Sequence, residues 1–427
     1  MKVLIVGGGG REHAIALKIK ENPEVTALYA APGNGGIAQI ATCLPFKATD
    51  VDGIVRWAAE NKVDFVIVAP DDPLCLGMVD ALAAQGIPAF GPRKNAAIIE
   101  GSKVFSKNLM KKYGIPTAAY ETFDDYDAAV KYLQTADMPI VVKADGLALG
   151  KGVLICPDRE SAVEAVASMM KEAKFGASGA RIVIEEFLTG PEVSVLAFTD
   201  GKTVKPMVSS MDHKRALDHD EGLNTGGMGT IAPNPCYTPE LAQRCMDEIF
   251  LPTIAAMNAE GRTFTGCLYF GLMMTPKGPK VIEYNCRFGD PETQVVLPLL
   301  KSDLLTIMRA TVDGTLADTP VEFASGAACC VVLASGGYPV SYKSGYPISG
   351  LDEAGKTATV FHAGTKLVDG QIVTAGGRVL GVTATADTLE AAIDKAYQAA
   401  DKITFTDMHM RRDIGQRALA SRKESHS

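Results

Sequence analysis

The side chains best suited to chemistry lie in the stretch 281–294, which begins as a predicted strand and ends in a turn rich in charge. Alternate side chains of a strand share one face. Glu283, Asn285 and, if the strand continues, Arg287 therefore form one row, with Asp290 and Glu292 just beyond it. Oxygen ligands suit Mg²⁺, which keeps phosphate oxygens and waters as its other ligands. A guanidinium beside the cation suits a bidentate phosphate contact.

The other side chains of this strand are expected to face a core: Ile282, Tyr284 and Cys286. The alternative interpretation is a solvated strand face followed by ordinary turn residues. That alternative explains one charged pair, but five charged or amide side chains in ten positions favour a binding site. The stretch therefore predicts a site for a divalent cation and a phosphate group.

The composition is that of an ordinary globular protein of 427 residues, of which 22% are charged. This length suggests about three domains. The net charge of -8 argues against a nucleic-acid-binding protein, because there is no basic surplus to neutralise a phosphate backbone. An anionic substrate then requires lysines and arginines that are gathered locally.

The nine cysteines are scattered without a C-x-x-C pair, and the adjacent Cys329 and Cys330 cannot form an ordinary zinc or disulfide framework. Such a set indicates buried or idle thiols in a reducing cytosol. The apolar run Val3–Val6 is too short for a signal peptide or a membrane span. We therefore expect a cytoplasmic protein.

The N-terminal residues predict an anion site. Residues 2–6 read as a buried parallel strand, followed by the four glycines 7–10 and a helix. Such a turn offers backbone N–H groups and a helix dipole to an anion. A dinucleotide fold is disfavoured, because the third glycine of G-x-G-x-x-G would fall at Glu12 or His13 and no acidic residue ends the next strand, 27–31. A simple phosphate suits the turn better.

Two further strand ends carry groups that suit a phosphorylated sugar. One strand runs into the glycine-rich loop 32–36, and another, 64–69, runs into Asp71 and Asp72. Ligands of open α/β sheets bind beyond the carboxyl ends of the strands. The predicted contacts are Gly8, Gly10, Gly33, Asn34 and Asp71. Helix-capping aspartates in a proline turn are an equally consistent alternative.

A third glycine-rich segment predicts a loop for a polyphosphate. A strand ends at Lys143 and enters a hairpin-like loop that contains Gly146, Gly150, Lys151 and Gly152. It is not a Walker A loop, which needs a glycine five residues before Gly150 and a Ser or Thr after Lys151. Three glycines let a loop close over phosphates, with N–H groups and lysines facing the oxygens. A plain hairpin with solvated lysines explains these residues equally well.

The rest of the chain mixes short strands with one long helix. Strands are expected at 181–188, 193–198, 205–208 and 266–274, and the helix at 239–259. From about Ser325 the sequence changes to short β-branched strands, which predicts a separate small α+β domain. In this domain Lys366 and Arg378 are interpreted as surface charges, with a contact to the active cleft as the alternative.

Residues 287–294 resemble the signature of the phosphoribosylamine–glycine ligases, the glycinamide ribonucleotide synthetases of the ATP-grasp superfamily. The resemblance extends over nearly the whole chain. The further matching segments are Arg11-Glu12-His13, Pro32-Gly33-Asn34, Gly101-Ser102-Lys103, 143–148, 212–215, 224–229 and 362–365. Eight signature residues with this collinear series make a specific match, unlike any single glycine loop.

The resemblance implies a multidomain protein of the α/β and α+β classes. Its implied parts are an N-terminal parallel-sheet domain over 1–102, a two-lobed ATP-grasp centre over 103–324 with a small lid lobe at about 120–190, and a C-terminal α+β domain over 325–427. The implied activity joins glycine to 5-phosphoribosylamine through glycyl phosphate, with ATP going to ADP and phosphate, in de novo purine biosynthesis. No Ser, Cys or His triad is expected for this chemistry.

By family likeness both lobes hold the nucleotide. The implied contacts are Lys103, Lys143, Gly146, Gly150, Lys151 and Gly152 at the phosphates, Glu185, Glu186 and Leu188 at the adenine edge, and Glu192 at the ribose. Glu283 and Asn285 are implied to ligate Mg²⁺ or Mn²⁺. Arg287 and Lys143 are implied to be catalytic, because they would stabilise the transferring phosphoryl group.

The implied substrate contacts beyond the N-terminal loops are Asp212, Lys214, Arg215, Arg287, Asp290 and Glu292. Asp290 and Glu292 are candidates for the ammonium of glycine or the incoming amine, and turn capping is the alternative for Asp290. His213 is expected to position its loop rather than to relay a proton. One departure is visible, since the family often carries Glu at the position of Asp71, and this leaves the sugar contact open.

The expected partners are small molecules, with no nucleic acid and no membrane, and the chain is expected to be a monomer. Two alternatives stay open. One is another ATP-grasp carboxylate–amine ligase or carboxylase that uses a different acid. The other is a non-catalytic nucleotide-binding protein that kept the lobes.

Overall fold

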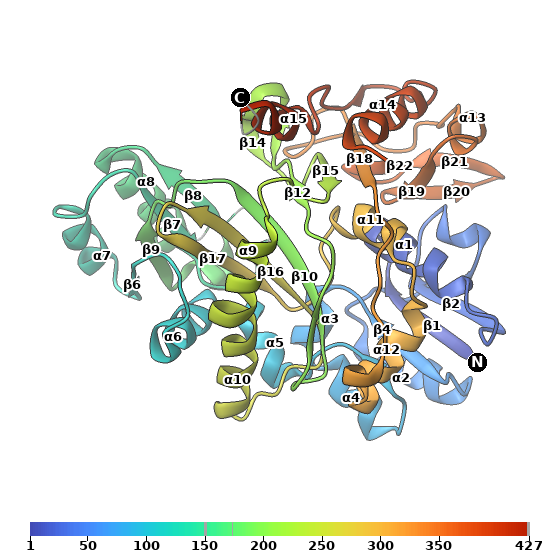
Figure 1. Cartoon of the computed structure of the whole chain (residues 1–427), viewed down its shortest axis with the longest axis horizontal. Helices are drawn as coiled ribbons and strands as arrows, with labels where there is room; N and C mark the ends of the chain where they lie inside the picture. The colour runs from blue at the N-terminus through green and yellow to red at the C-terminus, as the bar shows by residue number, and fades with distance from the viewer. Residues whose placement is uncertain (149–151, 173, 425–427) are drawn as a thin grey trace.

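The computed structural model describes residues 1–148, 152–172 and 174–424. Figure 1 shows an N-terminal layered domain, a central two-lobed region and a C-terminal region that covers one side of both. Within the described part of the chain, no helix is long and apolar enough to cross a membrane.

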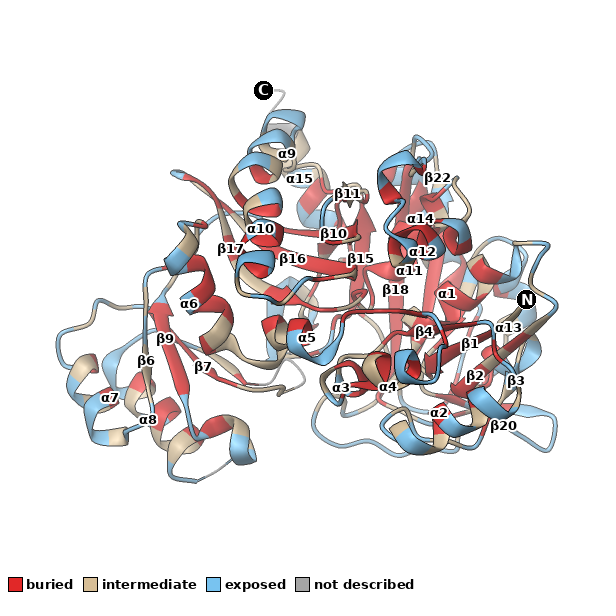
Figure 2. Ribbon diagram, turned by 90° about the horizontal axis from the view of Figure 1, so that it is seen from below, coloured by how far each residue is buried: buried red, intermediate tan, exposed pale blue. Residues whose placement is uncertain are grey.

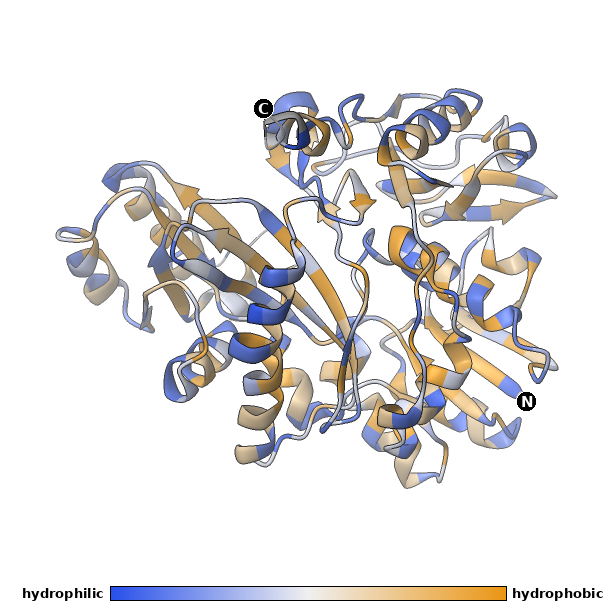
Figure 3. Cartoon of the chain, viewed as in Figure 1, coloured by the Kyte–Doolittle hydropathy of each residue, from blue (hydrophilic) through white to orange (hydrophobic). Residues whose placement is uncertain are grey.

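The N-terminal domain is built on a five-stranded parallel sheet of order β3-β2-β1-β4-β5. Its central strand β1 is buried on both faces because four consecutive apolar residues leave no polar side. The parallel strands are mostly orange in the hydropathy view of Figure 3. The elements are β1 (Lys2–Gly7), α1 (Gly10–Lys20), β2 (Ala27–Pro32), β3 (Thr42–Cys43), α2 (Val51–Glu60), β4 (Phe65–Val68), α3 (Asp71–Cys75), α4 (Met78–Ala84), β5 (Ala89–Phe90) and α5 (Lys94–Gly101).

The small lobe is a four-stranded antiparallel sheet, β6-β9-β7-β8, which two helices cover. It has a hydrophobic core of its own. Figure 2 shows it set apart from the other sheets, with the strands β7 and β9 buried. The elements are α6 (Lys103–Tyr113), which leads into the lobe, and β6 (Tyr120–Phe123), α7 (Tyr126–Leu133), β7 (Ile140–Ala144), β8 (Val153–Cys156), α8 (Arg159–Met170) and β9 (Ile182–Glu186).

The large lobe carries the sheet β11-β10-β16-β17, in which all three pairs are antiparallel. The expected long helix is present as α9 and α10, joined by a π turn at Met246–Phe250. The elements are β10 (Glu192–Thr199), β11 (Val204–Pro206), α9 (Pro239–Cys245), α10 (Leu251–Ala259), β16 (Gly266–Thr275), β17 (Gly278–Asn285), α11 (Thr293–Val296) and α12 (Leu304–Asp313).

The C-terminal sheet runs β12-β15-β18-β22-β19, with β23 also paired to β18. Two of its strands, β12 (Met211–Asp212) and β15 (Gly229–Ala232), precede Ser325 by many residues. The central segment therefore contributes directly to this sheet. The other elements are β13 (Arg215–Leu217), β14 (Glu221–Asn224), β18 (Ala327–Ser335), α13 (Leu351–Gly355), β19 (Thr359–His362), β20 (Thr365–Val368), β21 (Gln371–Thr374), β22 (Arg378–Ala386), α14 (Leu389–Ala400), β23 (Met408–His409) and α15 (Gln416–Glu424).

Three buried histidines lie where these regions meet. His13 on α1 accepts a hydrogen bond at Nδ1 from the backbone N–H of His362, at 2.8 Å. His213 uses both ring nitrogens, with Nδ1 3.0 Å from the carbonyl of Gly229 and Nε2 accepting from the N–H of Gly415 at 3.1 Å. Burial lowers the pKa of His13 to about 3, with His362 adding to the effect, and burial lowers the pKa of His213 and of His362 to about 4. All three are therefore neutral at pH 7.

We predict that acid destabilises the fold through these histidines. Unfolded histidines bind protons below about pH 6.5, whereas the folded ones do so only at about pH 4 or, for His13, about pH 3. The unfolded state therefore binds more protons between these values, and stability rises with pH. Three histidines contribute up to about 4 kcal/mol per pH unit near pH 5. The measurement is the unfolding midpoint from pH 7 to 4.5, with His213→Gln giving a shallower slope. Equal midpoints at pH 7 and pH 5 would contradict the prediction.

Candidate active site

The predicted metal ligands lie at the end of β17, where its side chains are re-aimed by a bulge. Gly271 pairs with Glu283 and Leu272 with Val281, so Ile282 is the extra residue. The bulge places Val281 in the core and leaves Ile282 half-buried, so the expectation that Ile282 faces the core is wrong. Tyr284 and Cys286 are buried, as expected. The sequence pattern missed the bulge because it assumed unbroken alternation.

Glu283 has room because its cross-strand neighbour is glycine. A Cβ on Gly271 would lie 2.9 Å from Cγ of Glu283. The carboxylate is partly open, with 34% of the side chain exposed, and Lys214 Nζ lies 3.7 Å from its Oε1. Burial alone would raise the pKa of Glu283, but Lys214, Lys143 and Lys103 lower it, so the group is ionised.

Asn285 completes a donor pair that suits a hard cation. Its side chain is 9% exposed and makes no hydrogen bond within the described residues. An unpaired amide oxygen beside an ionised carboxylate is the donor chemistry that Mg²⁺ or Mn²⁺ accepts, with phosphate oxygens and waters as the remaining ligands. Glu283 and Asn285 thus suit a cation that is bound together with a phosphate.

Arg287 lies beyond the strand rather than in its row, because β17 ends at Asn285. Its Nη2 is 3.0 Å from Oε1 of Glu100, and the other oxygen of Glu100 accepts from the N–H of Cys286 at 2.7 Å. Burial would lower the pKa of Arg287, but Glu100 and Asp71 raise it, so the guanidinium keeps its charge. Its buried Nε has no hydrogen-bond partner in the described structure, which leaves a donor for a ligand.

The predicted phosphate-binding lysines reach the same region from two elements. Lys103, at the start of α6, donates from Nζ to the carbonyl of Gly146 at 2.8 Å. Lys143, on β7, donates to the carbonyl of Ile282 at 3.3 Å and forms an ion pair with Glu185. The structure therefore brings both lysines next to Glu283, whose charge acts on Lys103.

The glycine loop after β7 is described only in part. Gly146 and Gly152 belong to the described structure, and a Cβ on Gly152 would lie 2.6 Å from Cβ of Ala148. Gly150 and Lys151, which were predicted at the phosphates, lie outside the described residues. β7 and β8 do form the antiparallel hairpin that the sequence suggested.

The predicted adenine and ribose contacts lie along the end of β9 and the start of β10. Glu185 is buried between two lysines, whereas the carboxylate of Glu186 accepts from the N–H of Ala119 at 3.2 Å. Leu188 follows the end of β9, outside the ladder. Glu192 begins β10 and lies 3.7 Å from Lys214 Nζ, so Lys214 bridges Glu192 and Glu283.

A separate pocket of about 340 Å³ joins the N-terminal loops to the C-terminal domain. Its lining includes Gly8, Gly33, Asn34, Asp290 and Arg378. All of these except Arg378 were predicted to bind substrate, and the structure brings them together. A Cβ on Gly8 would lie 2.4 Å from the carbonyl oxygen of Gly33, so only glycine allows this close approach.

The same pocket corrects the interpretation of Arg378 as a surface charge. Its Nη1 donates to the carbonyls of Asp290 and Gly226 at 3.0 and 2.9 Å, and its Nη2 lies 3.4 Å from the carboxylate of Asp290. These contacts join residues far apart in the sequence, which local pattern could not reveal. Lys366, in contrast, is exposed.

Several groups proposed for the substrates are engaged within the protein. The side-chain amide of Asn34 donates to the carbonyls of Gly8 and His362, and its oxygen accepts from the N–H groups of Gly36 and Ile37. The N–H of Gly9 donates to the carboxylate of Glu12 at 2.8 Å.

The other predicted substrate residues Gly10, Asp71 and Arg215 each have a neighbour within the protein. A Cβ on Gly10 would lie 2.5 Å from Nε2 of Gln294. Asp71 begins α3, and its charge raises the pKa of Arg287. Nη1 of Arg215 donates to the carbonyl of Gly222 at 2.8 Å.

Two carboxylates, Asp212 and Glu292, are close enough for the charge of Glu292 to act on Asp212, and Lys214 acts on both. The hydroxyl of Tyr269 donates to Oε1 of Glu292 at 3.2 Å. Burial raises the pKa of Asp212, and the charge of Glu292 raises it further; burial also raises the pKa of Glu292. Two acidic groups that disfavour each other's charge attract a cation such as an ammonium group.

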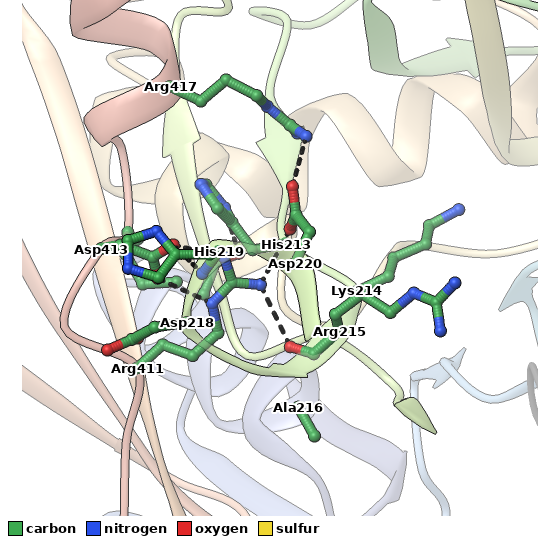
Figure 4. A network of polar contacts seen from close by, with 12 residues as sticks. His213, Lys214, Arg215, Ala216, Asp218, His219, Asp220, Arg411, Asp413 and Arg417 are labelled. Carbon is green, nitrogen blue, oxygen red and sulfur yellow. Dashed lines mark hydrogen bonds and ion pairs between the residues drawn. The ribbon is translucent and has the colours of Figure 1, made fainter. Parts of the chain in front are cut away.

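The segment that carries Lys214 is held by a buried arginine from the C-terminal domain (Figure 4). Arg411 is 1% exposed and binds Asp413 through Nε and Nη2, both at 2.8 Å. Its Nη1 donates to Asp220 and to the carbonyl of Arg215, both at 3.1 Å. His213 lies in the same network with both ring nitrogens engaged, and its role in positioning the loop stays a prediction.

Comparison with known proteins decides the family. Three models match in chain order: the Phosphoribosylglycinamide synthetase N domain over residues 1–100, the ATP-grasp (A) domain over 101–293 and the C domain over 328–417. The chain belongs to the phosphoribosylglycinamide synthetase family. This confirms the resemblance at 287–294 and the three-part fold class.

Two relatives named phosphoribosylamine–glycine ligase illustrate the family. The one from Halalkalibacterium halodurans is 48% identical over 425 residues, covering 100% of this chain and 99% of that protein. The one from Rhodopirellula baltica is 49% identical, covering 98% of each. The crystal structure of phosphoribosylamine–glycine ligase from Thermotoga maritima has a TM-score of 0.86 and 34% identity, covering 97% of this chain and 100% of that one.

A more distant structural likeness concerns the fold alone. Biotin carboxylase from Campylobacter jejuni has a TM-score of 0.73 at 15% identity, with 96% of this chain and 93% of that chain covered. The architecture of this family is therefore shared with carboxylases.

We predict that Glu283→Ala lowers turnover by orders of magnitude while the fold persists. The carboxylate is partly exposed, so its loss removes the predicted cation ligand without opening a core. Turnover as a function of Mg²⁺ and the unfolding midpoint are measured together. Glu248→Ala, which removes a partly exposed carboxylate on the long helix that pairs only with Arg244 within the described residues, is the control. Near-normal activity of Glu283→Ala at saturating Mg²⁺ would count against the ligand role.

Proposed function

We propose that this chain uses ATP to join glycine to 5-phosphoribosylamine, through glycyl phosphate, and releases ADP and phosphate. One observation carries the proposal: Arg287, at the start of the turn 287–292, acts on Glu283 together with Lys143 and Lys103, and Asp290 in the same turn lines the glycine-rich pocket. A phosphoryl donor and a phosphorylated amine bound at these two places would meet at that turn. Family membership supports the same reaction.

The chemistry needs positioned charges rather than a protein nucleophile. A carboxylate cannot be attacked by an amine until it carries a leaving group, and the γ-phosphoryl of ATP supplies one. Phosphoryl transfer depends on alignment and on neutralising charge over the transferred oxygens. Lys103, Lys143 and Arg287 supply that charge from three different elements.

The nucleotide is placed between the lobes. Lys103 and Lys143 would contact its phosphates, and the loop after β7 would cover them. The backbone at Glu186 and Leu188, where β9 leaves the ladder, would hold the adenine edge, with Glu192 at the ribose. Cover over the phosphates matters because an acyl phosphate hydrolyses in water.

Glu283 and Asn285 would hold Mg²⁺ or Mn²⁺. When bound, the cation neutralises phosphate charge and orients the polyphosphate. Lys214, which bridges Glu283 and Glu192, keeps this carboxylate ionised and ready to bind.

Glycine and phosphoribosylamine are placed on the other side of the turn. Asp212 and Glu292 would attract the ammonium of glycine, since their mutual repulsion is relieved by a cation. The pocket formed by Gly8, Gly33 and Arg378 would take the phosphate of the sugar. Asp71, close enough to act on Arg287, remains the candidate for a sugar hydroxyl.

The deciding experiment measures ADP release from Mg-ATP with candidate acids and fresh phosphoribosylamine. We expect release that requires both glycine and the amine, and formation of glycinamide ribonucleotide. Release that ignores glycine would contradict the assignment and favour another ligase or carboxylase. Absence of turnover with every acid would favour a nucleotide-binding protein.

We predict that Arg378→Met raises the KM for phosphoribosylamine and leaves the KM for ATP nearly unchanged. The guanidinium lines the 340 Å³ pocket and is remote in sequence from every predicted nucleotide contact. A lost charge-assisted hydrogen bond corresponds to a rise of about tenfold or more. Lys366→Met is the control, because Lys366 is an exposed lysine of the same domain. An equal rise in both KM values would contradict the pocket's assignment.

A further inference from the structure

Lys107 is a fully buried ammonium group behind the proposed nucleotide site. It lies on α6, one turn after Lys103, and 3% of its side chain is exposed. Its Nζ is 2.6 Å from Oε2 of Glu185, donates to Oγ1 of Thr117 at 2.7 Å, and donates to the carbonyl of Ala118 at 3.4 Å. The ammonium thus makes two hydrogen bonds and one ion pair, while Oε2 of Glu185 accepts no hydrogen bond within the described residues. Lys107 is therefore buried against protein partners and serves as a counter-ion of Glu185.

Lys143 faces the other oxygen of the same carboxylate but is bound less completely. It pairs with Oε1 of Glu185 and donates to the carbonyl of Ile282 at 3.3 Å. Within the described residues its ammonium makes one hydrogen bond beside the ion pair, where that of Lys107 makes two. Lys143 is thus the member of the pair that can turn toward a phosphate.

Glu185 needs another counter-ion when Lys143 turns toward a phosphate. Its side chain is 5% exposed, and an unpaired buried carboxylate is strongly disfavoured. If Lys143 were its only counter-ion, a phosphate would have to compete with Glu185 for that lysine. Lys107 removes this competition, because its ion pair with Glu185 stays when Lys143 moves.

We propose that Lys107 is a positioning residue, the fixed counter-ion of Glu185 that frees Lys143 to bind the phosphates of the nucleotide. The proposal rests on the phosphate-binding role of Lys143 in the proposed function. It assigns Lys107 no contact with substrate.

The test compares a nucleotide that has phosphates with one that has none. Equilibrium dialysis measures the affinities for Mg-ADP and for adenosine in the wild type and in Lys107→Gln, which keeps polar contacts but loses the charge. Lys143 should then remain paired to Glu185, so the affinity for ADP falls about tenfold, the worth of one charge-assisted hydrogen bond. The affinity for adenosine should change little.

A second variant makes the result specific. In Lys107→Gln/Glu185→Gln no carboxylate holds Lys143, so the ratio of ADP affinity to adenosine affinity should return toward the wild-type ratio. Lys107→Arg, which keeps a cation, should lose less ADP affinity than Lys107→Gln. Lys111→Gln, on the same helix but exposed, is the matched control. The unfolding midpoint of each variant shows that it is folded.

Two outcomes would overturn the proposal, and they differ from failure of the proposed function. Equal loss of ADP and adenosine affinity in Lys107→Gln would show a merely structural lysine. A double variant that does not recover the ratio would show that Glu185 does not compete for Lys143. A wild-type chain that binds neither ligand would overturn the proposed function, and this proposal with it.

Discussion

The carboxylate of Asp290 is the contact on which the arrangement of the site depends. It accepts from the N–H of Arg11 at the start of α1 and from the amide of Gln294, and it pairs with Arg378 on β22. Burial alone would raise the pKa of Asp290, but Arg378 and Arg11 lower it, so one buried charge is neutralised from two domains. Removing either arginine would leave this largely buried charge less well compensated, which is costly. Asp290 thereby fixes the N-terminal loops, the signature turn and the C-terminal domain around one pocket.

The same principle organises the rest of the centre, where opposite charges, some buried and some partly exposed, occur in balanced groups. Glu100 neutralises Arg287, and Lys214 lies between Glu192 and Glu283. Arg411 holds the segment behind Lys214 through Asp413 and Asp220. Because each group is braced before substrate arrives, the charges that phosphoryl transfer requires are oriented in advance.

Local pattern predicted much of this site, and its failures have physical reasons. The two-residue period of a strand predicted that Glu283 and Asn285 lie side by side, because both belong to the same strand. It misplaced Ile282, because a bulge depends on hydrogen bonds to β16 that the strand's own sequence does not record. The glycine loops were visible because close backbone approach demands glycine, as at Gly8 against Gly33.

What the sequence could not reveal were contacts between distant segments. Arg378 was interpreted as a surface charge, and Lys107 was not singled out at all. Their roles depend on Asp290 and Glu185, which the chain brings beside them only on folding. A buried arginine or lysine carries no local signature, since its burial is decided by elements that are remote in sequence.

The C-terminal sheet contains strands from both the central and the C-terminal segments, and this affects folding during translation. β15 leaves the ribosome long before β18, the strand against which it pairs, because β16, β17 and α12 are synthesised in between. Until β18 appears, β12 and β15 present an unpaired edge, the kind of surface that attracts other strands. The segment around Lys214 therefore acquires its final support late in translation. The central region can complete its folding only when the last part of the polypeptide has emerged.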